Sequence, residues 1–130
     1  MRTRARIGAE QGQSMVEAAF VLPVLCMVLF AIVQFGITFN NYLTLTDSVR
    51  VGARRAAVSR EASDPVGVAV SQVRSAAPGL NQGNLNVSVT SSWTPGSDVT
   101  VTAKYPYSIS LMGIVVHTGQ LSSSTTERVE

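Results

Sequence analysis

Glu17 stands directly before the most apolar stretch of the chain, and it is the residue whose chemistry most needs an explanation. An ionised carboxylate at the edge of a hydrophobic helix is costly to desolvate, so it should either have a charged or polar partner or lie among lipid headgroups. Gly12 precedes it in the segment G-Q-S-M-V-E, after a basic stretch with Arg2, Arg4 and Arg6. A glycine at this spacing is common by chance, and it becomes informative through this position between a basic segment and an apolar helix.

The other reactive side chains form no pattern typical of catalysis or metal binding. His117 is the only histidine and Cys26 the only cysteine, so sites that need two such residues are excluded, as is an internal disulfide. Three carboxylates, Glu61, Asp64 and Asp98, share no predicted face, and the glycines stand at turn-like places rather than in a phosphate-binding loop. We therefore expect no enzyme activity, no metal and no cofactor.

The segment after Glu17 has the length and composition of a membrane-spanning helix. No charged residue occurs from Ala18 to Thr46, and the centre of this run is AAFVLPVLCMVLFAIVQFGITF. A bilayer core requires about 20 mainly apolar helical residues. The alternative is a helix buried in a soluble core, but a chain of 130 residues rarely surrounds so apolar a helix on every side. The sequence therefore predicts a single-pass membrane protein.

Charges on the two flanks predict its orientation. The three arginines before the span, against Glu10 alone, favour a cytoplasmic N-terminus and an exported C-terminal part. Arg50, Arg54, Arg55 and Arg60 are a counter-signal, weakened by their distance from the span and by Asp47 and Glu61. A cleaved secretory signal or a lipoprotein fits poorly, because the apolar run is long, lacks an A-x-A exit, and has Leu25 before Cys26 in mid-span.

The segment from Gly12 to Ala57 resembles the signature of TadE-like proteins, which are minor pilins or pseudopilins of the tight-adherence pilus system. Its family-like features are V-E-A at Val16 to Ala18, L-P at Leu22 and Pro23, Q-F-G at Gln34 to Gly36, N-Y at Asn41 and Tyr42, and the run from Arg50 to Ala56. Two positions depart from the family. Many relatives have an acidic residue in place of Gln34 and an aromatic one in place of Ala18.

This resemblance implies a processing site and a set of partners. A prepilin peptidase would cut between Gly12 and Gln13, and the new amine of Gln13 would pair with Glu17 of a neighbouring subunit. The implied partners are other pilin-like subunits, the Tad membrane assembly platform, the prepilin peptidase and the lipid bilayer. We expect no nucleic acid, because the arginines after the span are typical of a solvated helix face. The implied location is the bacterial inner membrane, with incorporation into the pilus left open.

Two other classes of function stay open at the level of sequence. The chain could be a signal-anchored envelope protein whose outer domain acts as a binding module, or a single-pass regulatory subunit of another secretion machine. Cleavage of the leader would distinguish a pilin-like subunit from both alternatives, since only a pilin-like subunit needs the free amine of Gln13.

The rest of the chain predicts an α+β fold in three parts, namely a basic leader (1–12), a transmembrane helix with an amphipathic stalk (13–58) and a small exported domain (59–130). Apolar residues from Tyr42 to Ala56 recur at helical spacing, so the span should continue as a stalk to about Ala57. Asp64 and Pro65 are typical of a helix start, and Pro78-Gly79 of its stop.

Alternating periodicity after Gly83 predicts a small three-stranded antiparallel sheet. Its strands begin near Leu85, Val99 and Leu121, with a turn at Pro95-Gly96 and an edge or bulge at Pro106. We expect the short helix to pack on this sheet, with Val66, Val70 and Val73 facing Val87, Val89, Val99 and Val101. The apolar patch from Ile109 to Val116 has two interpretations: a short helix or loop that covers the sheet, or a contact surface. So small a domain should be only marginally stable alone.

Overall fold

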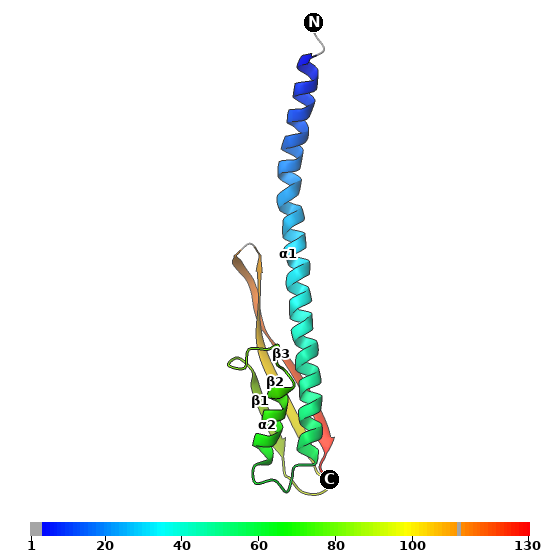
Figure 1. The fold of residues 1–130 in the computed structure, drawn as a ribbon, viewed down its shortest axis with the longest axis vertical. Coiled ribbons are helices and arrows are strands. Elements are labelled where there is room, and N and C mark those ends of the chain that lie inside the picture. Colours follow the sequence, from blue (N-terminus) through cyan, green and yellow to red (C-terminus); the bar gives the residue numbers. More distant parts are fainter. Residues whose placement is uncertain (1–3, 112) are drawn as a thin grey trace.

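The computed structural model describes the backbone of residues 4–111 and 113–130 and the side chains from Gly12 onward, apart from Met112. One long helix, α1 (Arg4–Ala57), runs the whole length of the molecule, and its C-terminal part lies along a small sheet (Figure 1). At about 1.5 Å per residue, its 54 residues extend for about 80 Å. The N-terminal part of α1 stands clear of the sheet (Figure 1). The predicted continuation of the apolar helix into a stalk that ends at Ala57 is confirmed.

The second helix, α2 (Pro65–Ser75), begins as its sequence predicts. The Asp64 side chain accepts a hydrogen bond from the Gly67 backbone N–H at 2.9 Å, and Pro65 occupies the first turn. Arg74 in the last turn donates to the backbone oxygens of Gln82 at 2.7 Å and Leu85 at 3.2 Å. These bonds hold the end of α2 beside the chain that leads into the sheet.

Three antiparallel strands in the order β1-β2-β3 form the sheet, which confirms the predicted α+β fold. They are β1 (Asn86–Ser91), β2 (Asp98–Leu111) and β3 (Ile114–Arg128). A turn at Gly96, whose φ is +79°, joins β1 to β2, as Pro95-Gly96 predicts. Strand β1 pairs with β2 only as far as Lys104, so from Tyr105 onward β2 has β3 as its one neighbour.

The patch from Ile109 to Val116 is neither a short helix nor a loop over the sheet, contrary to the first of the two interpretations. Its described residues complete β2 and begin β3, so the two strands form a hairpin that projects beyond β1 (Figure 1). Strand β3 consequently begins seven residues earlier than Leu121, at Ile114. Pro106 lies where β2 has an open edge, as expected for a residue without a backbone N–H, and the bulge falls later, at Ile109/Ser110.

The sheet is covered mainly by α1, whereas the sequence prediction assigns that role to α2. Leu45, Val49 and Ala53 of α1 are fully buried in one cluster with Val99 and Val101 of β2. Helix α2 packs chiefly against α1, contributes Ala69 and Val73 to the same core, and leaves Val66 exposed. The prediction that Val66 faces the sheet is therefore wrong, because the stalk, not α2, supplies the larger apolar face.

Small residues allow the two helices to approach closely. A Cβ atom added to Gly52 would overlap Cγ2 of Val73 and would lie 3.4 Å from the backbone oxygen of Ala69. The chain end closes the same region, where the Glu130 N–H donates to the Ala57 carbonyl oxygen at 3.1 Å. The C-terminal end of α1 is thereby fixed on both sides.

Candidate membrane anchor and processing site

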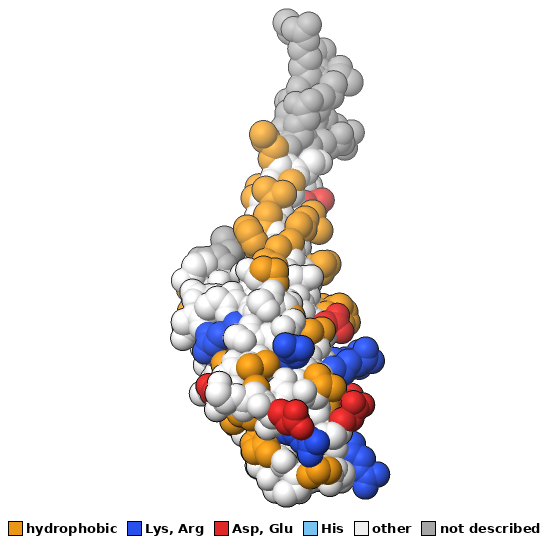
Figure 2. All heavy atoms as spheres, turned by 60° about the horizontal axis from the view of Figure 1, so that its bottom comes forward, with side chains coloured by type: hydrophobic (Ala, Val, Ile, Leu, Met, Phe, Trp, Pro, Cys, Tyr) orange, Lys and Arg blue, Asp and Glu red, His pale blue; other side chains and the backbone are white. Residues whose placement is uncertain are grey.

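The apolar run of α1 is exposed, because nothing else in the molecule covers it. Phe20, for example, has 76% of its surface exposed, and most other large apolar residues from Met15 to Phe39 are also exposed. Figure 2 shows apolar side chains along the shaft of the helix, with basic and acidic side chains gathered over the domain at its other end. Among the described residues, α1 is the one helix long and apolar enough to cross a membrane. Since none of its most apolar window is buried in the molecule, the run is not a core helix of the domain.

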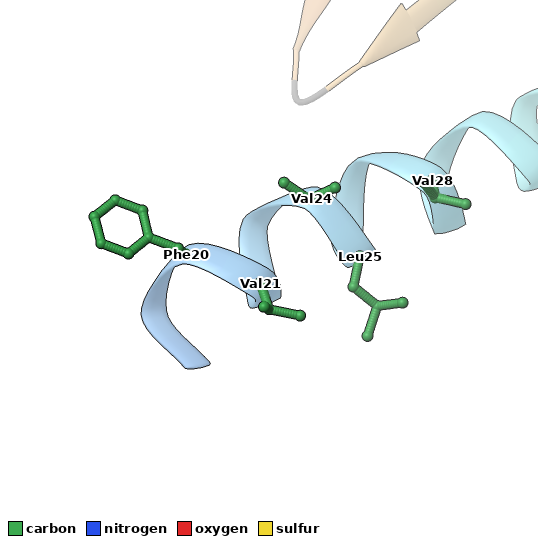
Figure 3. A pocket seen from close by; sticks show the side chains of 5 residues that line it. All are labelled: Phe20, Val21, Val24, Leu25 and Val28. Carbon is green, nitrogen blue, oxygen red and sulfur yellow. The ribbon is translucent and has the colours of Figure 1, made fainter. Parts of the chain in front are cut away.

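A shallow apolar groove on this shaft is formed by Phe20, Val21, Val24, Leu25 and Val28. All five side chains come from the same few turns of α1 and project outward from it, and no second element closes the hollow (Figure 3). Grooves between rows of side chains four residues apart accept the ridges of another helix or acyl chains. The groove is thus suited to an apolar neighbour and carries no polar group that could orient a substrate.

At the cytoplasmic end predicted from the sequence, Gly12, Gln13 and Glu17 lie on one continuous stretch of α1. The Gln13 side-chain amide donates to the Glu17 carboxylate at 3.3 Å, across one helical turn, and both side chains are exposed. A Cβ atom built on Gly12 has nothing within 4 Å. The structure therefore brings the three predicted residues together on an exposed helix. The charges of the leader, Arg2, Arg4 and Arg6, lie outside the described side chains.

Gln34 has a partner that sequence reasoning did not find. Its amide lies 3.4 Å from the hydroxyl of Ser110 at the end of β2, and its backbone oxygen accepts from the Thr38 hydroxyl at 2.9 Å. A polar side chain inside an apolar span needs such partners. The same two elements also form an apolar hollow, which is lined by Val28, Ala31, Ile32 and Phe35 of α1 and by Ile109 and Leu111 of the hairpin. The contact joins residues 76 positions apart, so no local sequence signal could reveal it.

The remaining candidates lie apart from this site. His117 is exposed on β3, with its ring 6.0 Å from that of Tyr107, and Cys26 is half-buried on the span. Within the described residues no three histidine, cysteine or acidic side chains are placed to hold a metal ion. Arg50 lies 3.6 Å from Asp47 and Arg60 lies 3.3 Å from Glu61, in exposed pairs that contribute little to stability.

Fold and site together define a membrane-anchored protein with one apolar helix and a small α+β domain. The family model for TadE-like proteins matches residues 12–54, which confirms the resemblance predicted from the sequence. No curated protein and no solved structure matches the chain.

Proposed function

We propose that this protein is a TadE-like minor pilin or pseudopilin, a non-enzymatic assembly component of a tight-adherence pilus or a related secretion system. The observation that carries the proposal is the coincidence of the family match with the exposed shaft. The matched segment begins at Gly12 and includes Glu17 and the whole apolar run that the molecule itself leaves uncovered. An apolar helix of this kind can lie in a bilayer and can later pack among the helices of other subunits.

In this proposal a prepilin peptidase cuts between Gly12 and Gln13. Glycine within a helix costs about 1 kcal/mol relative to alanine, so the helix is locally weak at this bond. Since nothing packs where a Gly12 side chain would lie, the peptidase can unwind α1 there without breaking a tertiary contact at that residue. Cleavage would remove the segment 1–12 with its arginines and create a positive amine on Gln13.

Glu17 then provides the complementary charge. Its carboxylate is exposed and accepts one bond from the Gln13 side chain at 3.3 Å, and a carboxylate can accept several hydrogen bonds. The amine of an adjacent subunit would therefore find an accessible acceptor at the same end of the helix. A charge pair in a place of low polarity stabilises assembly only when both partners are present.

In this proposal the N-terminus lies in the cytoplasm and the domain of residues 59–130 lies outside the inner membrane, an orientation that the arginines of the leader favour. The partners in this account are other pilin-like subunits, the Tad assembly platform and the prepilin peptidase. Neither a nucleic acid nor a cofactor takes part.

Deletion of the protein in its native host, followed by complementation, tests the proposed function. We expect surface filaments to be lost on deletion and restored by the wild-type chain. Glu17→Asp, which keeps the charge, should restore them better than Glu17→Gln. Normal filaments in the deletion strain would contradict the proposal and favour a signal-anchored binding module of the envelope.

A further inference from the structure

The β2–β3 hairpin is longer than the sheet requires. Strand β1 pairs only as far as Lys104, yet β2 and β3 remain paired from Tyr105 to Leu111 and from Ile114 to Leu121. Only the first pair of this extension, Tyr105 and Leu121, packs against the core, and the residues nearer the tip add nothing to the buried cluster. The part of the hairpin beyond Tyr105 and Leu121 therefore has another role.

The β3 side of the tip is apolar on both faces. Ile114, Val115 and Val116 are consecutive in β3, with 72%, 59% and 61% of their surfaces exposed. Successive strand residues point to opposite faces, so this end of β3 presents an apolar side chain on each face. The polar residue opposite it, Ser110 of β2, is paired with Gln34. Farther along β3, from Ser122 to Thr126, the side chains are all serine or threonine. The exposed apolar residues of β3 are therefore confined to the tip.

This tip lies beside the apolar part of α1, not beside its stalk. Ile109 and Leu111 share a hollow with Val28, Ala31, Ile32 and Phe35, and Ser110 meets Gln34. At about 1.5 Å per residue, Val28 lies roughly 15 Å along the helix from Ala18 and Gln34 roughly 24 Å. In a hydrocarbon core of about 30 Å that begins near Ala18, this is the half of the span nearer the domain.

We propose that the β2–β3 hairpin tip inserts into the bilayer leaflet on the domain side, beside α1, as a second membrane contact. The lipid is favoured as its occupant because the apolar surface of the tip is continuous with the helix surface that the bilayer must cover. A hydrocarbon environment suits both faces of the tip at once, whereas a protein partner would have to enter the membrane to the same depth.

Residues that flank the tip agree with this placement. Tyr107 lies three strand residues from Ser110, about 10 Å farther from the tip, which is level with the polar end of the span near Asn40. Its ring lies 6.0 Å from that of His117 and covers Gly119, the residue opposite it in β3. Amphipathic rings are typical of the boundary between hydrocarbon and headgroups. The outer edges of the two strands are open along the whole hairpin, and open strand edges are unfavourable in lipid, so insertion is confined to the few residues of the tip.

Collision measurements on spin-labelled full-length protein test the insertion. A Cys26→Ser chain carries one new cysteine, Val115→Cys or Val116→Cys, labelled with a nitroxide and reconstituted in phosphatidylethanolamine–phosphatidylglycerol vesicles. Ile32→Cys on the span and Ser88→Cys on β1 are the references for lipid and water. Oxygen concentrates in lipid and a nickel chelate in water, so we expect both tip labels to show an oxygen-to-nickel collision ratio several-fold above that of Ser88 and close to that of Ile32.

Two results would overturn the proposal. One is a ratio at both tip positions equal to that of Ser88, which would place the tip in water. The other is a tip shielded from both reagents, with spin–spin broadening that disappears when unlabelled protein is added, which would show a neighbouring subunit instead of lipid. Val115 and Val116 point to opposite faces, so agreement between them excludes an effect of one label.

Discussion

At the scale of the residue, the two polar side chains of interest on the apolar helix are Glu17 and Gln34. Glu17 could be singled out from the sequence because its charge and its place before the span are both visible there. Gln34 was recognised only as a departure from the family, and its function as a contact for Ser110 depends on a hairpin 76 residues away. The processing site thus stays a prediction from local pattern, whereas the long-range contact became visible only in the fold.

Glu17→Gln should separate anchoring from assembly. The substitution removes a charge at the N-terminal end of the apolar span, so insertion of the helix into the membrane should be unchanged or easier. Loss of the charge pair should lower co-purification with other pilin-like subunits after cross-linking in the native host. Membrane fractionation and the cross-linked yield are measured on the same cultures, with Glu17→Asp as control. Equal cross-linking of Glu17→Gln and the wild type would remove Glu17 from the assembly contact.

At the scale of the element, short sequence signals predicted helix starts and turns correctly, but the sequence did not predict which helix packs on the sheet. Asp64-Pro65 and Pro95-Gly96 predicted a helix start and a turn, because capping and positive φ are local properties. Periodicity indicated which faces are apolar, but not that the stalk of α1 would cover the sheet in place of α2. The run from Ile109 to Val116 was ambiguous, since a short apolar run fits a strand or a helix equally well.

Gly52→Ala should destabilise the domain, because the added methyl overlaps the buried, β-branched Val73. Overpacking of this kind costs typically 1–3 kcal/mol. Gly36→Ala is the matched control in the same helix, where a Cβ meets nothing within 4 Å. Thermal unfolding in detergent should show a lower midpoint for Gly52→Ala only. Equal midpoints for the two variants would contradict the close packing of α1 on α2.

Thr46→Val should stabilise the junction between span and domain. The Thr46 hydroxyl is buried and has no hydrogen-bond partner in the described structure. Burying an unsatisfied hydroxyl costs about 1–3 kcal/mol, and valine has nearly the same shape. We expect a higher unfolding midpoint in detergent, with Thr44→Val, whose hydroxyl donates to the Asn40 carbonyl at 3.0 Å, as the control that gains nothing. A lower midpoint for Thr46→Val would show that the hydroxyl is satisfied, for example by water.

At the scale of the whole molecule, one helix serves as membrane anchor at one end and as the main wall of the domain core at the other. The domain is consequently held close to the span, with its hairpin directed back along it (Figure 1). The sequence predicted both halves of α1, but the division into parts 13–58 and 59–130 stays a prediction. The sequence did not show that the stalk half of this helix packs against the sheet as its main cover.

Topology belongs to this scale. We expect the domain to be outside the cytoplasm, because the arginines of the leader favour a cytoplasmic N-terminus. Alkaline-phosphatase fusions after Ser63 and at the C-terminus should be active, and fusions to a cytoplasmic reporter at the same points should be inactive. The reverse result at both points would place the domain inside and invalidate the proposed location.

The central claim is that the chain is a processed, pilin-like subunit, and the intact mass of the protein from its native host tests this most directly. We expect a mature chain that begins at Gln13, and a full-length chain when the prepilin peptidase is deleted. A bulky Gly12→Leu substitution should also leave the chain uncut, whereas the small Gly12→Ala should be cut in part. A wild-type chain that still carries residues 1–12 with the peptidase present would contradict the account.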